Sequence, residues 1–500
     1  MAPARRGRGP RATSGGTIAA VSSDAARTTD APDGAAPRRP PLRVAVVGSG
    51  PAGVHTAGAL VAAGLERGAR VDVLERLPVP FGLVRYGVSP DHPDMKAVTA
   101  TLAEVLDHPD VRLVANVEVG RDVTLEELRA AYDAVVLATG SSTDAPLDLP
   151  GADLPGCWGA SEVVAWYQGH PEAPRHWDLS AREVAVLGVG NVALDVARVL
   201  ARPAEDLLAT EVPAAVHADL AASRLTDVHV VGRRGPEHAR FSPLELRELG
   251  AVPGVDVVVD PADLVLAPEA VDHLAGDRRA RQVVDALASF AERGTTGAPR
   301  RVHLRFSRTP VEVLGRDAGR VTGLRTRRAH AGAAGVVEDL PVQAVYRAVG
   351  YRSRPVPGAP FDDRRGVVPN EDGRVLAADG EPERGLYVVG WLKTGPVGLV
   401  GHTRKDARAT VASVLEDVAR EPAAAAPPAD PLDLVERLRA GGLHVVDLDG
   451  WRSVDAAELR AGADAGRPRV KLVSREDMLA AARAGSSGGD AGGPAGRGPS

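Results

Sequence analysis

The chain has almost no cysteine, and none of its apolar stretches is long. Cys157 is the only cysteine in 500 residues, which excludes an intrachain disulfide, a CxxC redox pair and an iron–sulfur cluster held by this chain's own thiolates. No apolar run approaches the length that spans a bilayer, so we expect no membrane insertion. The formal net charge of −6 gives no reason to expect nucleic-acid binding, and we assign no metal ligands.

The remaining composition is that of a soluble globular protein, with 44% hydrophobic and 25% charged residues. Five hundred residues exceed what one core normally serves, so we expect at least two domains. Residues 1–42 and the tail from Ser486 onward lack periodicity and are predicted to be disordered. The early arginines resemble a transit peptide without its apolar helical face. We therefore expect a cytoplasmic protein, with the mitochondrial matrix as the alternative.

The first nucleotide-binding pattern follows the apolar run Leu42–Val47. It reads GSGPAG, and its residues are Gly48, Gly50, Pro51, Ala52 and Gly53. Small and apolar residues continue at helical spacing, and a second apolar run ends in Glu75. A carboxylate at that position accepts hydrogen bonds from both ribose hydroxyls, so the pattern predicts an unphosphorylated adenosine. A later strand that ends in Ala-Thr-Gly140 returns the chain to this site.

The next segment, PVPFGLVRYGVSPDHP, has too much proline and glycine for a regular element and is predicted to be an ordered loop. Ordered loops of this length are usually functional. Gly82 and Leu83 are its candidate cofactor contacts, and Asp91 and His92 place titratable groups at its far end. The alternative is a turn followed by a helix that Asp91 or Ser89 caps.

A second glycine pattern follows the buried strand predicted for Val184–Leu187. Gly188 and Gly190 allow a tight turn into a helix whose first N–H groups can face a pyrophosphate. The strand after that helix ends in Arg233 and Arg234, where a site for an unphosphorylated ribose usually has an acid. Two guanidinium groups can bind a 2′-phosphate, so we expect an NADP(H) site. The alternative is a solvated arginine pair.

One unphosphorylated and one phosphorylated dinucleotide indicate FAD and NADP(H) as the cofactors. We predict an α/β fold with two doubly wound, Rossmann-like domains. The NADP domain, residues 181–354, is inserted in an FAD domain that comprises residues 43–180 and 355–485. The last glycine-rich segment, GLYVVGWLKTGPVGLVG, returns to the flavin. Because the chain has no CxxC pair, the second electron acceptor must be another molecule.

Several strings together resemble the ferredoxin–NADP reductases of the adrenodoxin reductase type, a glutathione-reductase-like lineage. They are GSGPAG, ERLPVPFGLVRYGVSPDHP, LGVGNVALDVAR, VGRRGP, LELRE and GWLKTGPVGLVG. The resemblance covers residues 43–480 and includes the long connection between Gly188 and Arg233. It implies electron transfer between NADPH and a small acidic ferredoxin, by hydride transfer to flavin and then single-electron transfer. We expect a monomer.

The resemblance also implies roles for individual residues. Glu75 is similar to the acid that binds the FAD ribose, and Trp391 and Gly398 to residues at the isoalloxazine ring. The implied NADP contacts are Asn191 and Val192 at the pyrophosphate, and Arg233, Arg234 and Glu245 at the ribose phosphate. His92 and Glu248 resemble a pair that assists catalysis near the nicotinamide.

The sequence departs from the family pattern in one loop and has one unassigned basic cluster. Thr394 and Val397 stand where the family usually has Arg and Thr, which removes a positive charge near the nicotinamide or the partner. Arg278, Arg279 and Arg281 are a candidate docking face for the acidic ferredoxin. The alternative for this cluster is a solvated helix face.

Two other functions are compatible with parts of the sequence. A quinone or dye reductase, or the electron-input subunit of a larger complex, would keep both nucleotides and change the acceptor. Such subunits usually carry cysteine-ligated clusters, which one cysteine does not allow. A non-enzymatic NADP sensor would not need Glu75 or the GWxKxGPxG loop, and both are present.

Overall fold

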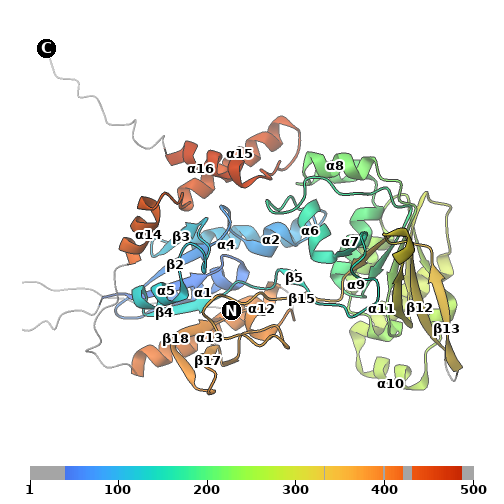
Figure 1. Cartoon of the computed structure of the whole chain (residues 1–500), viewed down its shortest axis with the longest axis horizontal. Coiled ribbons are helices and arrows are strands. Elements are labelled where there is room, and N and C mark those ends of the chain that lie inside the picture. The colour runs from blue at the N-terminus through green and yellow to red at the C-terminus, as the bar shows by residue number, and fades with distance from the viewer. Residues whose placement is uncertain (1–39, 331–332, 398–399, 421–430, 487–500) are drawn as a thin grey trace, which may run out of the picture. The chain divides into compact units, whose positions relative to one another are not determined.

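The computed structural model describes residues 40–330, 333–397, 400–420 and 431–486 (Figure 1). Its first sheet has seven strands in the order β16-β17-β18-β4-β1-β2-β3. These are β1 (Leu42–Val47), β2 (Ala69–Glu75), β3 (Val111–Ala115), β4 (Ala134–Leu137), β16 (Asn370–Glu371), β17 (Arg374–Leu376) and β18 (Pro382–Val388). The five strands from β18 to β3 are parallel. Helices cover both faces of such a sheet, which explains the continuous apolar runs in its strands.

Alternate residues of β1 contact different helices. Val44 and Val46 pack in one core with α1 (Pro51–Val61), α4 (Val98–Leu106) and α13 (Val400–Arg420). Ala45 and Val47 pack on the other face with α5 (Leu125–Ala131) and α14 (Pro431–Ala440). This alternation follows from the two-residue period of a strand.

The second sheet has six parallel strands in the order β6-β14-β7-β8-β10-β9. They are β6 (Cys157–Gly159), β7 (Glu183–Leu187), β8 (Asp227–Val231), β9 (Val255–Val259), β10 (Arg300–Arg305) and β14 (Ala344–Arg347). One face packs on α6 (Ala160–Tyr167), α7 (Asn191–Ala201), α9 (Pro243–Gly250) and α11 (Arg278–Arg293). The predicted α/β fold with two doubly wound sheets is confirmed.

An antiparallel sheet packs against the second sheet's other face, and sequence reasoning did not anticipate it. It consists of β11 (Arg308–Leu314), β12 (Gly323–His330) and β13 (Ala333–Leu340). Val313 and Leu324 of this sheet share a core with Ala185 and Leu187 of β7. The other short elements between β7 and β14 are α8 (Ala214–Ala221), α10 (Pro268–Gly276) and 3-10 turns at Ala204–Ala209, Pro236–His238, Pro261–Leu264 and Arg316–Ala318.

The chain passes between the two sheets twice, and the two passages pair with each other. β5 (Thr143–Asp144) and β15 (Tyr351–Arg352) form a short antiparallel ladder. Beyond β5, β6 pairs with β14, so the second sheet already includes a strand at residues 157–159. The sequence predicts instead that the inserted domain begins at Ala181. A three-residue strand leaves too short a pattern to detect in sequence.

The C-terminal helices α15 (Leu448–Asp464) and α16 (Arg475–Ser486) pack on the core of the first sheet. The segment between them reaches the elements that surround the second sheet (Figure 1). Arg467 donates to the carbonyl of Thr210 at 2.9 Å, and Lys471 Nζ lies 2.7 Å from Glu211 Oε1. Burial lowers the pKa of Lys471 to about 7. Glu458 of α15 holds this segment in place, since its backbone carbonyl accepts from the Val470 N–H at 3.1 Å and its Oε1 from the Leu472 N–H at 2.9 Å.

Candidate functional site

The first glycine turn joins β1 to α1. Gly48 has φ +115°, and a Cβ there would lie 2.5 Å from the carbonyl oxygen of Ala138, so only glycine fits. Gly53 packs equally closely, since its Cβ would lie 1.9 Å from the Gly48 carbonyl oxygen. Gly50 is the N-cap of α1, and no side chain caps that helix. Its first N–H groups are therefore available to an anion.

Glu75 at the end of β2 is held in a fixed orientation beside this turn. Its Oε2 accepts hydrogen bonds from the Ser49 hydroxyl at 2.7 Å and the Ser49 N–H at 3.2 Å. Its Oε1 accepts from the N–H of Leu77 at 3.0 Å. A carboxylate has about four acceptor positions, so capacity remains for ribose hydroxyls.

A cavity of about 670 Å³ opens at the glycine turn, within the range of cofactor sites. It brings together most of the residues predicted for the first nucleotide: Gly48, Gly50, Pro51, Ala52, Glu75, Gly82, Leu83, Gly140 and Trp391. Gly53 supports the turn from behind and does not line the cavity. Gly398 lies outside the described residues.

The segment predicted as an ordered loop contains a short helix, α2 (Gly82–Tyr86). Phe81 begins it with φ 82°, an unusual value for a bulky residue. Its N–H donates to the carbonyl of Ser49 at 3.1 Å, which attaches the segment to the glycine turn. A Cβ on Gly82 would lie 3.2 Å from Gly50 Cα. The prolines and glycines thus limit the helix to five residues and allow this close contact.

His92 lies in a buried cluster of charged groups that connects the two sheets' helices. Its Nε2 lies 3.0 Å from Glu245 Oε2 and 3.2 Å from Asp195 Oδ1, and its Nδ1 lies 3.4 Å from Glu248 Oε2. Burial lowers the pKa of His92, but the hydrogen bonds to Asp195 and Glu245 outweigh it and raise the pKa to about 10. The structure thus brings the predicted pair His92 and Glu248 together.

The same geometry limits what else this cluster can bind. Ligand atoms of His92, Glu245 and Glu248 lie within 4.8 Å of one another, a spacing that a metal ion could use. The guanidinium of Arg198 contacts His92 Nε2, the ring nitrogen that faces Glu245, and a cation in that position disfavours a metal ion there. Burial raises the pKa of Glu248, whose Oε2 accepts no hydrogen bond within the described residues. The cluster is therefore suited to holding a proton at Nδ1 or at this carboxylate.

Asp91 does not cap a helix, as one reading of the sequence allowed. α3 (Pro93–Lys96) has no side-chain cap. The Asp91 carboxylate instead lies 2.7 Å from Arg198 Nε and 3.2 Å from Arg202 Nη2. Burial opposes ionisation, but the bonds from Arg198 prevail and hold the pKa of Asp91 well below its usual range.

Asp195 and Arg198, both on α7, are functional candidates that sequence reasoning missed. They are three residues apart on an otherwise apolar helix, and their side chains pair at 2.7 Å. That spacing inside an apolar run was the available signal, because buried charges require partners. Arg198 also contacts Glu245 at 3.2 Å. Glu245 is thereby fixed in the His92 cluster, and its contact with the NADP ribose phosphate stays a prediction.

The second glycine turn has the same backbone design as the first. Gly188 has φ +135°, and its Cβ would lie 2.2 Å from the carbonyl oxygen of Ala348. Gly190 is the N-cap of α7, which again has no side-chain cap. Asn191 Oδ1 accepts from the N–H of Ser242 at 2.8 Å and joins the turn to the start of α9. Val192 is half-buried beside the core.

Arg233 and Arg234 follow β8 and are exposed. Within the part of the chain that the structure describes, neither guanidinium forms a hydrogen bond or ion pair. Both are therefore available to a phosphate.

The loop after β18 contains α12 (Trp391–Thr394). Trp391 stacks on Tyr351 with ring centroids 6.0 Å apart and lines the first cavity. Lys393 pairs with Asp406 at 2.8 Å. The Thr394 hydroxyl donates locally, to the carbonyls of Gly390 and Gly395. Position 394 therefore contributes no positive charge to this loop, as expected for a threonine.

Comparison with known proteins identifies the family. A family model described as pyridine nucleotide-disulphide oxidoreductase matches residues 42–235. The NADPH-ferredoxin reductase FprA of Mycobacterium tuberculosis is 39% identical over 455 residues, 88% of this chain and 98% of the relative. The mitochondrial NADPH:adrenodoxin oxidoreductase of Arabidopsis thaliana is 39% identical over 464 residues, 88% of this chain and 95% of the relative. The chain belongs to this reductase family.

The solved structures agree with that assignment. Mycobacterium tuberculosis FprA in complex with NADPH matches with a TM-score of 0.82 at 38% identity, covering 89% of this chain and 100% of the other. The resemblance stated from sequence motifs is confirmed, and so is the fold. The reductase uses FAD and NADP(H). The disulphide chemistry in the family model's description has no counterpart here, since Cys157 is the sole cysteine.

The residues of the first cavity fit FAD. The uncapped N-terminus of α1 suits its pyrophosphate, and Glu75 suits its ribose. Trp391 and α2 supply flat and backbone surfaces for the ring. No helix in the described ranges combines the length and the apolar character needed to cross a membrane.

Proposed function

We propose that this reductase passes electrons from NADPH through FAD to a ferredoxin-type iron–sulfur protein. The observation that carries the proposal is the opposite charge after the two glycine turns: Glu75 at one, Arg233 and Arg234 at the other. Bound flavin accepts two electrons from NADPH and releases them singly. The protein's part is to bind both nucleotides, orient them and control protons.

In this proposal the FAD domain comprises residues 43–180 and 355–485, and the NADP domain residues 181–354. Strand β6, at residues 157–159, crosses that division because it pairs with β14. The paired strands β5 and β15 connect the two domains. Flavin contacts come from the first cavity, and the NADP pyrophosphate contacts are Asn191 and Val192.

His92 and Glu248 are the proposed proton-handling pair. The Asp195 and Glu245 carboxylates hold the His92 imidazolium in place at 3.2 and 3.0 Å. The Glu248 carboxyl, with its raised pKa and unmatched Oε2, can exchange a proton with Nδ1. Because Asp195 and Glu245 balance the charge of the imidazolium, what the cluster offers is the proton on Nδ1, which faces Glu248.

An acidic ferredoxin is the proposed partner, with the start of α11 as one docking element. Arg278 is exposed there. Arg279 donates to the carbonyl of Phe241 at 2.8 Å, and Arg281 to that of Ala275 at 2.9 Å. Both guanidiniums are held by neutral carbonyls and keep their charge available. We expect the Arg278→Glu and Arg281→Glu double variant to raise the KM for ferredoxin at low salt and to leave dye reduction by NADPH unchanged.

A cytoplasmic monomer is the proposed state of the protein, and the mitochondrial matrix is the alternative location. The relatives from Arabidopsis thaliana and Bos taurus are described as mitochondrial, whereas FprA comes from a bacterium. Fractionation of cells that express the full chain separates the two locations, and light scattering after gel filtration gives the mass.

The deciding experiment measures the acceptor. Purified flavin-loaded protein with NADPH should reduce an acidic ferredoxin at physiological salt, followed by coupled cytochrome c reduction. Quinones and dyes serve as the comparison acceptors. Reduction of dyes or quinones without reduction of any ferredoxin would contradict the proposal and favour the quinone reductase alternative.

A further inference from the structure

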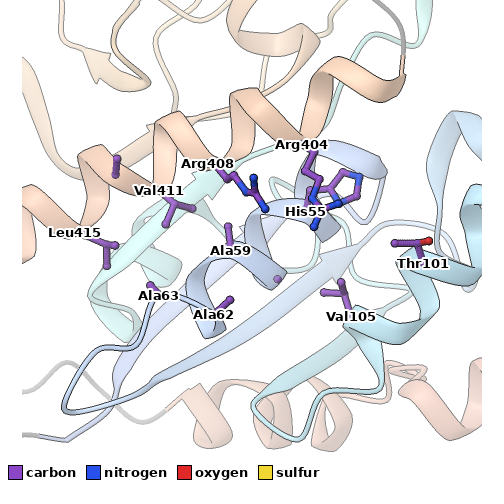
Figure 2. Close-up of a pocket in the computed structure, with 12 residues that line it drawn as sticks. His55, Ala59, Ala62, Ala63, Thr101, Val105, Arg404, Arg408, Val411 and Leu415 are labelled. Carbon is purple, nitrogen blue, oxygen red and sulfur yellow. The ribbon is translucent and has the colours of Figure 1, made fainter. Parts of the chain in front are cut away.

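A second cavity, of about 430 Å³, lies on the outer side of α1 between α4 and α13 (Figure 2). It shares no residue with the first cavity and none with the His92 cluster. Gly58 and Ala59 of α1 contribute to its lining, Gly58 without a side chain and Ala59 with only a methyl group, so α1 projects little into the space between the two flanking helices. Nothing in the proposed electron transfer uses this space.

One end of the cavity is cationic. His55 of α1 lies beside Arg404, and Arg408 extends from the next turn of α13 (Figure 2). Burial, and then the charges of Arg404 and Arg408, lower the pKa of His55. Among the described residues neither arginine has an acidic partner or any hydrogen bond. This end therefore presents two exposed guanidiniums.

The other end is aliphatic. Val411 and Leu415 of α13 line it, with Ala62 and Ala63, which directly follow α1, opposite, while Val105 of α4 lies nearer to His55 (Figure 2). Arg404 and Leu415 are separated by about 16 Å at the rise of an α-helix. The cavity is therefore elongated, with charge at one end and apolar surface along the rest.

We propose that this cavity binds a single-chain amphiphile with a carboxylate head group. The carboxylate pairs with Arg404 and Arg408, whose planar donors match its two oxygens. The alkyl chain lies along α1 toward Leu415, where its burial removes apolar surface from water. The volume is within the range of small-molecule sites.

Isothermal titration calorimetry on the flavin-loaded full chain tests the proposal, with sodium decanoate as the probe below its micelle concentration. We expect one decanoate per chain. The Arg404→Ala, Arg408→Ala double variant should bind at least tenfold more weakly, and so should Ala59→Leu, which fills the cavity and leaves the arginines. Arg460→Ala, an exposed arginine on α15, is the matched control and should bind as the wild type does. Flavin absorbance confirms that each variant is folded.

Two further probes separate the head from the chain. Acetate carries the head group alone, and 1-decanol carries the chain alone; both should bind at least tenfold more weakly than decanoate. Equal binding of acetate would reduce the site to a surface anion contact and overturn the proposal. Equal binding of decanol, or unchanged binding in the double variant, would overturn it as well. Flotation with phosphatidylglycerol vesicles, without binding of free decanoate, would assign the arginines to a membrane surface instead.

Discussion

The two glycine turns have nearly the same backbone and different surroundings. Gly48 and Gly188 both have positive φ, and both lie where a Cβ would meet a carbonyl oxygen within 2.5 Å. At the first turn, Glu75 is held by three hydrogen bonds beside a cavity built from distant parts of the chain. At the second, Arg233 and Arg234 are exposed. The turn thus supplies the contacts to the pyrophosphate. The residues at the end of the following strand select the nucleotide, and the surrounding segments determine how tightly it is enclosed.

The largest effect is expected from removing the arginine pair. In the Arg233→Ala, Arg234→Ala double variant we expect the preference for NADPH over NADH, as a ratio of kcat/KM, to fall about a hundredfold. Charge-assisted hydrogen bonds contribute ~1.5–3 kcal/mol each, and each ~1.4 kcal/mol is a factor of ten. Flavin content should not change. An unaltered coenzyme preference would place the 2′-phosphate elsewhere.

The two turns can also be damaged one at a time. Gly188→Ala should weaken NADP+ binding about tenfold and leave flavin in place, while Gly48→Ala should release flavin. Each alanine would carry backbone strain of ~1–3 kcal/mol together with the carbonyl contact. Equilibrium dialysis measures NADP+, and the ratio of absorbance at 450 and 280 nm measures flavin. Loss of both nucleotides in either variant would show that the turns are not independent.

A further prediction concerns Glu75, which lies beside the first glycine turn. Glu75→Ala should weaken FAD binding by up to about tenfold, because it removes ribose hydrogen bonds of ~1.5 kcal/mol and the bonds that fix Ser49. Flavin content after extensive dialysis gives the result. Glu75→Gln, which keeps the shape and one acceptor, should lose less. Full retention of flavin in the alanine variant would count against this role.

The last prediction concerns the protonation of two histidines. His92 should remain protonated at about pH 8, while His55, whose pKa is lowered, should be neutral. Since the pKa of His92 rises from 6.5 to about 10 on folding, its protonation stabilises the fold fully below pH 6.5, and this contribution is lost as the pH rises through about 10. NMR of 15N-labelled histidine follows both rings. Titration of His92 near 6.5 would contradict the cluster's geometry.

Much of the site could be predicted because its signals are local. Each glycine turn lies directly between a strand and a helix, and Glu75 ends the adjoining strand. The order of these elements in the sequence is therefore enough to predict that the turn and Glu75 lie close together. His92 and Glu248 are 156 positions apart, and only the family resemblance joined them. Asp195 and Arg198 were missed because a charged pair inside an apolar helix has no unique partner in sequence.

The parts that could not be predicted depend on contacts between distant segments. β6 is too short to carry a pattern, and its place in the second sheet is determined by β14, almost 190 residues later. Lys471 is an ordinary surface residue in sequence terms, yet it is buried against Glu211. Such pairings form only when both partners are in place, and the secondary-structure propensity of a local segment does not encode them.

The order of strands has a consequence for synthesis on the ribosome. The second sheet is complete once β14 has emerged at Arg347, whereas the first sheet still lacks β16, β17 and β18, the last of which ends at Val388. The inserted unit can therefore close its hydrophobic core while the unit that began earlier is still open. At ~5–20 residues per second the delay is several seconds. During that time one edge of β4 has no strand beside it. The edge is paired only when β18, a later part of the same chain, arrives.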